Sequence, residues 1–158
     1  MMRLHVGTRA RLVCDDQEAR WVDPDQDAGL SCRVLVVDDD PELAAALAGA
    51  LRLEPGMQVS VAIGVDEGIA AARRGVDVAL VDVRMPGGGG PELARRIGCS
   101  RLGVAVVAMS ATADHAARAT MHAAGAVGFL DKSDPIEVVC ASVRVAYGLP
   151  SPRLAEQP

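Results

Sequence analysis

The stretch Arg33–Pro41, with the sequence RVLVVDDDP, decides the fold. Its first part, Arg33–Val37, is a β-branched apolar run of the kind found in strands that are buried on both faces. Three aspartates follow at once, and Pro41 then opens a helix at the position where its missing N–H costs nothing. Asp40 is the expected N-cap of that helix. The stretch therefore predicts a buried strand that ends in carboxylates and leads directly into a helix.

Short apolar runs alternate with helical stretches from Arg33 to Gly148. After the first strand, the pattern predicts strands at Met57–Ala62, Val76–Val81, Gly103–Met109 and Ala126–Leu130. It predicts helices that begin at Pro41, run from an Asp66 cap to Arg74, begin at Pro91, span about Thr112 to Ala124, and run from Asp134-Pro135 to Tyr147. Five strands alternating with five helices predict an α/β fold, a doubly wound five-stranded parallel sheet with helices on both faces.

Two of the predicted helices show an apolar face. The inward residues of the first are expected to be Leu43, Ala46, Leu47, Ala50 and Leu51, and those of the last to be Ile136, Val139, Cys140 and Val143. The last helix also carries a second stripe, made of Val138, Ser142 and Val145. This stripe is either partly buried against the first helix or a contact for a second copy of the chain or another partner.

Composition limits the function classes. The chain has 158 residues, of which 50% are hydrophobic, and a formal net charge of -5. Such a length is typical of one domain with appendages. The acidic balance argues against a broad nucleic-acid footprint, so no direct nucleic-acid binding is expected. No run approaches the roughly 18 apolar residues of a membrane span, and no apolar signal core opens the chain. We therefore expect a cytoplasmic protein without membrane contacts.

The two ends of the chain differ from its middle. Residues 1–32 contain the single tryptophan and an acidic run at Asp23–Asp27, and Leu4–Val13 alternates weakly, as a strand would. This N-terminal extension is expected to be a flexible tail or an over-extended gene start, or else a contact or regulatory arm. Residues 149–158 are rich in proline and are expected to be a C-terminal tail. The folded domain is then 33–148.

Polar side chains stand where each central strand is expected to end. Asp38 and Asp39 follow the first strand, Asp82 the third, Ser110 the fourth and Lys132 the fifth. The carboxyl ends of parallel strands share one edge of the sheet, so these groups are expected to converge. Three carboxylates at one edge repel one another, and a single ammonium leaves two negative charges uncompensated. Oxygen ligands of this kind favour Mg²⁺.

A magnesium ion facing an ammonium is also the electrostatic setting for receiving a phosphoryl group on a carboxylate. Lys132 is the single lysine among the 16 Lys and Arg residues, which indicates a position that arginine cannot fill. Ser110 could hydrogen-bond one of the phosphoryl oxygens.

Four motifs together carry a family resemblance. They are VLVVDDDP at 34–41, DVRMP at 82–86, SA at 110–111 and FLDK at 129–132. In this order and at this spacing they resemble the receiver domain of two-component response regulators, over residues 33–148. The resemblance is strongest to receivers that precede a helix-turn-helix DNA-binding module. It implies the flavodoxin-like (βα)5 fold with strand order 2-1-3-4-5.

The resemblance also implies a role for each site residue. Asp82 matches the phosphoacceptor, which takes its phosphoryl group from a phosphohistidine of a sensor histidine kinase. Asp39 matches the direct Mg²⁺ ligand, and Asp38 the acid that holds the metal through water. The backbone carbonyl of Arg84 matches the remaining protein ligand.

Three further residues match the part of the family that responds to phosphorylation. Ser110 and Lys132 match the two residues that grip the phosphoryl oxygens. Phe129 matches the switch aromatic, which turns inward when the hydroxyl residue moves toward the phosphate, although it could equally be a core residue. The last helix and the surface beside the fifth strand would then report the change.

The sequence departs from the family pattern in two places. Gly89 stands where many relatives carry aspartate, and the run Gly87–Gly90 predicts an unusually flexible loop after Asp82. Lys132 is followed by Ser133 instead of the frequent proline, so the cis peptide of many receivers is not assumed here.

Three functions from different classes fit the sequence. The first is a phosphoacceptor switch that acts through phosphorylation-dependent contact with a partner or a second copy. The second is the receiver half of a DNA-binding transcriptional regulator whose output module is absent from this chain. The third is a haloacid-dehalogenase-like phosphatase, which Asp38–Glu42 does not support because its first motif is incomplete. The first is favoured, and it is not an enzyme but an acceptor that promotes its own phosphorylation and dephosphorylation. As a plain structural alternative, Asp38 and Asp39 could merely cap the first helix.

Overall fold

The chain divides into two compact units, residues 1–30 and 31–158. The computed structural model describes residues 11–15, 18–22, 31–112 and 114–148. In the first unit, β1 (Arg11–Asp15) pairs antiparallel with β2 (Glu18–Val22). The strand predicted at Leu4–Val13 overlaps β1 only at its end, and its first part lies outside the described residues, as does the predicted tail 149–158. No helix among the described residues is long and apolar enough to cross a membrane.

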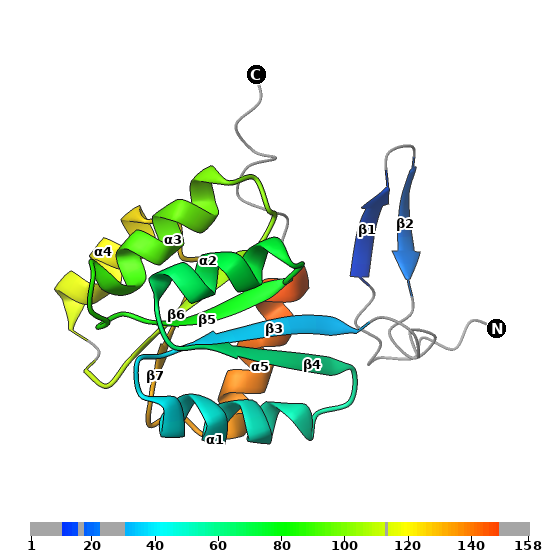
Figure 1. Cartoon of the computed structure of the whole chain (residues 1–158). Helices are drawn as coiled ribbons and strands as arrows, with labels where there is room; N and C mark the ends of the chain where they lie inside the picture. The colour runs from blue at the N-terminus through cyan, green and yellow to red at the C-terminus, as the bar shows by residue number, and fades with distance from the viewer. Residues whose placement is uncertain (1–10, 16–17, 23–30, 113, 149–158) are drawn as a thin grey trace. The chain divides into compact units, whose positions relative to one another are not determined.

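The second unit alternates strands and helices along its described length (Figure 1). Its strands are β3 (Cys32–Val37), β4 (Met57–Ala62), β5 (Val78–Asp82), β6 (Ala105–Ser110) and β7 (Gly128–Asp131). Its helices are α1 (Pro41–Arg52), α2 (Val65–Arg73), α3 (Gly89–Cys99), α4 (His115–Ala123) and α5 (Ile136–Gly148).

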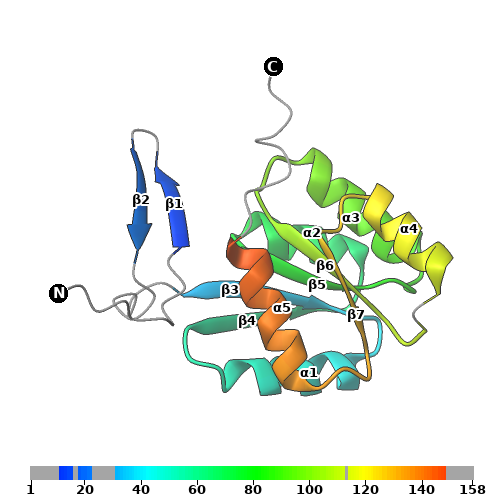
Figure 2. The same cartoon turned by 180° about the vertical axis from the view of Figure 1, so that it is seen from behind.

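The five strands form one parallel sheet in the order β4-β3-β5-β6-β7. Counted within this unit, the order is 2-1-3-4-5, so the predicted fold class and topology are confirmed. Helices α2, α3 and α4 lie on one face of the sheet and α1 and α5 on the other, as the two opposite views show (Figures 1 and 2). Strands this apolar need cover on both faces, and the two groups of helices provide it.

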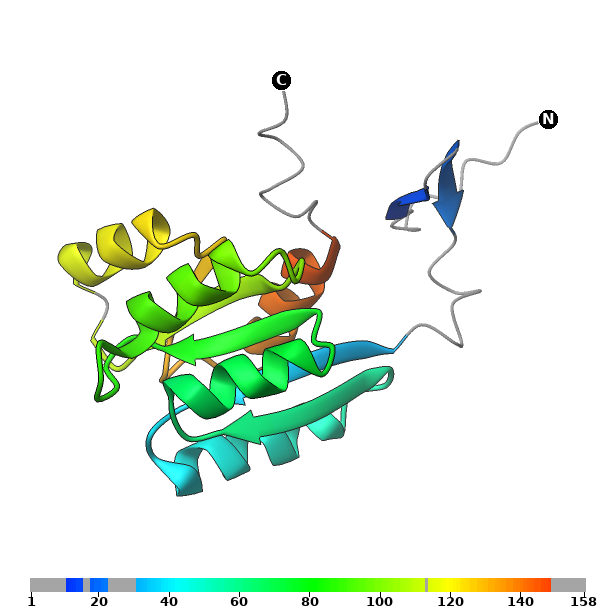
Figure 3. The ribbon, with the colours of Figure 1, turned by 45° about the horizontal axis from the view of Figure 1, so that its top comes forward.

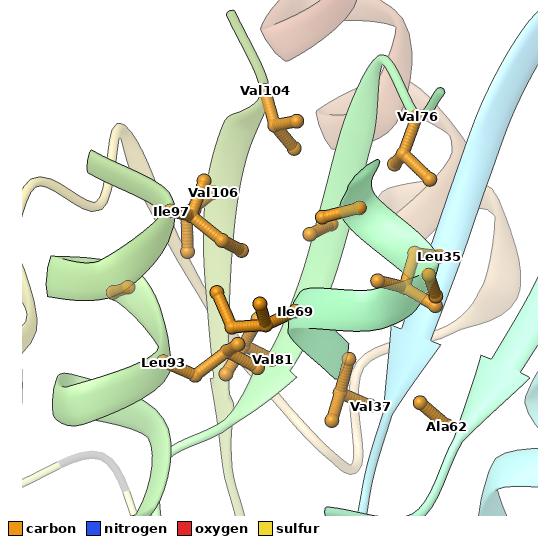
Figure 4. Packing of buried hydrophobic residues seen from close by; sticks show 14 of the residues in the cluster. Leu35, Val37, Ala62, Ile69, Val76, Val81, Leu93, Ile97, Val104 and Val106 are labelled. Carbon is orange, nitrogen blue, oxygen red and sulfur yellow. The ribbon is translucent and has the colours of Figure 1, made fainter. Parts of the chain in front are cut away.

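Side chains of the central strands alternate between two cores. Leu35, Val37 and Val81 face α2 and α3, where they meet Ile69 and Leu93 (Figure 4). The intervening residues, such as Val34, Val36 and Leu80, face α1 and α5. Because successive side chains point to opposite faces, burial in both cores fixes how each strand lies in the sheet. It therefore also fixes where the polar residues that follow the strand are placed.

Three strands begin later than the apolar pattern predicts. Val76, Val104 and Ala126 are buried, yet each precedes its strand by one or two residues. Before β5, the Asp77 carboxylate accepts hydrogen bonds from the Arg33 backbone N–H and guanidinium, which occupies the chain before the ladder starts. The apolar pattern therefore marks where the chain becomes buried, and the strand itself begins one or two residues later.

Helix starts were predicted with mixed success. Asp40 caps α1 as expected, since its Oδ1 accepts from the N–H groups of Glu42 and Leu43. The predicted Asp66 cap is wrong: α2 starts after Gly64, and Asp66 pairs with Arg96 of α3 at 2.9 Å. The predicted start of α3 at Pro91 is also wrong, because the helix begins at Gly89.

The apolar face predicted for α1 is also only partly correct. The buried residues are Ala44, Ala48 and Leu51, whereas Leu43 keeps 40% of its surface exposed. Ala44, Ala48 and Leu51 make the contact of the helix with the sheet, and Leu43 lies outside it. In α5, the predicted Val139, Cys140 and Val143 are buried together with Ala146, and Ile136 is half-buried.

Four consecutive glycines, Gly87–Gly90, form the end of the loop after β5 and the first two residues of α3. Gly87, Gly88 and Gly89 have φ angles of 73°, 91° and 64°, in the left-handed region that favours glycine. A Cβ at Gly90 would lie 2.3 Å from the carbonyl oxygen of Asp82. This close approach lets the Gly90 N–H donate to the carbonyl of Val83. The glycines therefore allow one particular backbone path under the end of β5.

Gly90→Ala should destabilise the fold by about 1–3 kcal/mol, because the added methyl group meets backbone that cannot move aside. Gly49→Ala is the matched control: it lies on the exposed side of α1, and its Cβ would meet nothing within 4 Å. This control should gain about 0.5–1 kcal/mol from helix propensity. Urea unfolding measures both, and equal effects of the two substitutions would contradict the close approach.

Candidate functional site

Five side chains predicted from the sequence come from four neighbouring strands of the sheet. Asp38 and Asp39 follow β3, Asp82 ends β5, Ser110 ends β6 and Lys132 follows β7. Because the strands are parallel, their carboxyl ends reach the same edge of the sheet, and Figure 3 shows β4 and β5 directed toward it. The structure therefore brings these residues to one rim.

Lys132 contacts two of the three carboxylates. Its Nζ lies 2.6 Å from Asp38 Oδ2 and 3.3 Å from Asp82 Oδ2. The lysine side chain is 19% exposed, and those of Asp38 and Asp82 are 2% and 5% exposed. Burial disfavours the ammonium, but the hydrogen bonds and charges of the two carboxylates outweigh it, so the pKa of Lys132 is raised. The lysine is therefore held in its charged form.

Asp82 is buried and only partly compensated. Burial raises the pKa of its carboxyl, and the nearby charge of Asp38 adds to this effect. The Arg84 backbone N–H, which donates to Asp82 Oδ1 at 3.3 Å, and the Lys132 ammonium act in the opposite direction. The carboxylate is thus destabilised where it stands, which favours a reaction or a ligand that removes or shares its charge.

The three aspartates form a group that suits a divalent cation. One oxygen from each of Asp38, Asp39 and Asp82 lies within 4.8 Å of the others. Asp39 is exposed, and its carboxylate makes no hydrogen bond or ion pair within the described part of the chain. The donor set consists of oxygens with a single ammonium opposite, so the residues present fit Mg²⁺.

Helix capping does not explain Asp38 and Asp39. The cap of α1 is Asp40 alone. Asp38 instead accepts from the Asp40 N–H through Oδ1, at 3.0 Å, and from Lys132 through Oδ2. Both oxygens of this buried carboxylate are therefore used to hold the rim together.

Ser110 is buried and hydrogen-bonded away from the carboxylates. Its Oγ donates to the carbonyl of Thr112 at 2.8 Å and accepts from the Thr112 N–H at 3.2 Å. The hydroxyl thus sits at the rim but is bound to the chain that leads toward α4. It would have to leave Thr112 to contact a group on Asp82.

Two arginine contacts at α4 were not predicted. The Arg84 side chain pairs with Asp114 at 3.1 Å, and Asp114 also caps α4 by accepting from the Ala117 N–H. The Arg118 guanidinium lies 4.5 Å from the centre of the Phe129 ring, which is half-buried on β7. The first links the loop after Asp82 to α4, and the second links α4 to the predicted switch residue. Neither has a local sequence signal.

The second stripe of α5 does not pack against α1. Val138 and Val145 are 42% and 56% exposed, and with Ser142 they line a groove beside β7 that also includes Phe129. Partial burial on the first helix, one of the two sequence-based alternatives, is therefore wrong. The stripe is an exposed apolar surface at the edge of the sheet.

Asp82→Asn should make the protein more stable at neutral pH. Because burial raises the pKa of folded Asp82, its ionised carboxylate opposes folding above that pKa. This opposition disappears below the unfolded pKa of about 4, so the stability difference between variant and wild type should vanish there. Urea unfolding across this pH range, with a chelator present, measures the difference.

Asp66→Asn serves as the control for Asp82→Asn, since the Asp66 side chain is 95% exposed. A stability gain for Asp82→Asn that persists unchanged in acid would show that the Asp82 charge is not what opposes folding.

Comparison with known proteins identifies the family of this chain. The family model described as "Response regulator receiver domain" matches residues 34–144. Response regulator UvrY of Escherichia coli (strain K12) is 31% identical over 116 residues, covering 72% of this chain and 53% of UvrY. Response regulator GacA of Pseudomonas viridiflava is 32% identical over 130 residues, covering 79% and 61%. The chain thus spans little more than half the length of these relatives.

Solved receiver structures have the same fold. The signal receiver domain of NarL from Mycobacterium tuberculosis aligns with a TM-score of 0.66 and 29% identity, covering 76% of this chain and 99% of that one. A LuxR-family two-component response regulator from Aurantimonas sp. SI85-9A1 aligns with a TM-score of 0.69 and 27% identity, covering 80% and 94%. The resemblance seen in the sequence motifs is confirmed, and the chain belongs to the family of response regulator receiver domains.

Proposed function

We propose that this receiver domain is a phosphoacceptor switch in which Asp82 takes a phosphoryl group from a phosphohistidine of a sensor histidine kinase. The observation that carries the proposal is the Lys132 ammonium between the buried Asp38 and Asp82, with Asp39 close by. A buried acid beside a fixed cation at the strand ends of an α/β sheet is a reactive arrangement. UvrY and GacA are response regulators, which supports a sensor kinase as partner.

The transfer step is a displacement at phosphorus. An oxygen of the ionised Asp82 carboxylate forms the new P–O bond, the P–N bond of the phosphohistidine breaks, and the imidazole takes up a proton. The product is an acyl phosphate. The Lys132 ammonium can donate to the phosphoryl oxygens, and the Arg84 N–H can hold the remaining carboxylate oxygen in place.

Asp38, Asp39 and Asp82 would hold Mg²⁺, with the backbone carbonyl of Arg84 as a further ligand. When bound, the ion supplies positive charge opposite the phosphoryl oxygens. The chain itself keeps Asp38 in position through Lys132 and the Asp40 N–H.

Phosphorylation would be read out through Ser110 and Phe129. Ser110 would exchange its hydrogen bonds to Thr112 for the phosphoryl group, which frees the segment leading to α4. Phe129 would then turn inward, and its contact with the Arg118 guanidinium would change. The exposed groove of α5 and β7 is the surface that would change for a downstream partner or a second copy.

This function is that of an acceptor that promotes its own phosphorylation and dephosphorylation, and we do not propose an enzyme with a separate substrate. The match to the receiver family does not favour a haloacid-dehalogenase-like phosphatase. The chain would act in the same compartment as its kinase, which we expect to be the cytoplasm.

Intact mass after incubation with a small-molecule phosphodonor tests the proposal. Wild type should gain the mass of one phosphoryl group with Mg²⁺ and little without it. Asp82→Asn should gain none, while Asp66→Asn, an exposed carboxylate on α2, should behave as wild type. Normal adduct formation by Asp82→Asn would contradict the assignment of the acceptor.

Mg²⁺ should also stabilise the fold by binding the native state. At a concentration 100 times its Kd, the gain in unfolding free energy should be about 2.7 kcal/mol, and Asp39→Ala should abolish most of it. NaCl at matched ionic strength is the control for screening. If Mg²⁺ and NaCl stabilise wild type equally, the aspartates do not form a metal site.

A further inference from the structure

The segment that carries Lys132 forms a turn in which side chains hydrogen-bond to the backbone. Asp131 Oδ1 accepts from the Ser133 N–H at 2.8 Å and from the Ser133 hydroxyl at 2.6 Å. Lys132 therefore lies inside a turn in which a carboxylate binds the backbone two residues on. No cis peptide bond occurs in the part of the chain that the structure describes, so this turn is built from trans peptides.

A second pair of hydrogen bonds closes the same turn from the other side. The Asp131 N–H donates to Asp134 Oδ2 at 2.8 Å, and the Asp134 N–H donates to the carbonyl of Asp131 at 3.0 Å. The Lys132 N–H donates to the carbonyl of Ser110 at 2.9 Å, which fixes the turn to the end of β6. These hydrogen bonds thereby hold Asp131 on one side of Lys132 and Ser133 and Asp134 on the other.

The Asp131 carboxylate reaches Lys132 only through the backbone. The ion pairs of the Lys132 ammonium are with Asp38 and Asp82, and Asp131 is not among its partners in the described residues. Two hydrogen bonds from Ser133 lower the pKa of Asp131, so the acceptor is ionised and these bonds are charge-assisted. Asp131 therefore positions the backbone of Lys132, whereas the ammonium is bound by the buried Asp38 and Asp82.

We propose that Asp131 and Ser133 are positioning residues that aim the Lys132 ammonium at Asp38 and Asp82. The Ser133 hydroxyl and N–H bind one oxygen of Asp131, and this fixes the backbone on both sides of the lysine. A lysine side chain has many rotamers, so its ammonium reaches two acceptors at once only if its backbone is fixed. A proline at this position, as in many receivers, would remove both donors and would need another way of holding the lysine.

The expected consequence for phosphorylation rests on the proposed function. Ser133→Ala removes one charge-assisted hydrogen bond and should slow phosphorylation by a small-molecule donor about threefold to tenfold. Asp131→Ala removes the acceptor of both bonds and should slow it at least as much. Ser133→Thr keeps the hydroxyl and should restore the wild-type rate.

A readout that does not depend on phosphorylation comes from the composition. Lys132 is the single lysine of the 158 residues, so this chain grown with 13C-lysine gives one side-chain ε-methylene signal in an NMR spectrum. In wild type this signal should show two distinct ε protons and slow side-chain motion, as expected of a fixed ammonium. In Ser133→Ala and Asp131→Ala it should move toward the sharp, averaged signal of a mobile lysine, and Ser133→Thr should return it to the wild-type form.

Ser100→Ala is the matched control, because it removes a serine hydroxyl hydrogen bond of 2.8 Å, to the carbonyl of Ile97 at the end of α3, that is not part of the turn around Lys132. It should leave the Lys132 signal unchanged. A Lys132 signal that stays at its wild-type form in both Ser133→Ala and Asp131→Ala would overturn the positioning role. Loss of the fixed signal in these variants would support it even if wild type takes no phosphoryl group, a result that would contradict the proposed function alone.

Discussion

The contact of the Lys132 ammonium with Asp38 and Asp82 is the interaction on which the rest of the structure depends. Two carboxylates buried this deeply would be strongly unfavourable without a cation. The cation comes from β7 and the carboxylates from β3 and β5, so it can reach them only in a sheet where these strands end at one edge. The pairing of the site's charges therefore constrains the order of the strands, since a different order would leave buried charges unpaired.

The charge of the same cluster is incompletely neutralised, and the helix beside it, α4, has few buried contacts. Three carboxylates lie together and the single ammonium pairs with two of them, so the rim gains from any added positive charge. Helix α4, which borders this rim, buries only Met121 among its described residues and is further held by the two arginine contacts at Asp114 and Phe129. An element with so few buried contacts moves at low free-energy cost. A change of charge at Asp82 therefore has a nearby element that can respond to it.

Local sequence patterns predicted most of the strands, a helix cap and the residues at the strand ends, but not the contacts between residues that are distant in the sequence. The strand runs, the Asp40 cap and the strand-end residues follow from patterns within a few positions, and the family motifs added their roles. The Asp66 cap was wrong because a tertiary partner, Arg96, occupies that side chain. The contact of Arg84 with Asp114 spans thirty positions, and nothing in the sequence links the two. Similarly, the glycines after Asp82 indicated flexibility, whereas the approach of Gly90 to β5 requires them.

We propose that this rim forms one reaction centre with Asp82 as its acceptor. Borohydride reduces an acyl phosphate to an alcohol and leaves ordinary carboxylates intact, so it marks the phosphorylated residue covalently. Peptide mapping of the chain after phosphorylation and reduction then identifies that residue. We expect conversion at Asp82 alone, with Asp38 and Asp39 unchanged. Conversion at either neighbouring aspartate in place of Asp82 would contradict it.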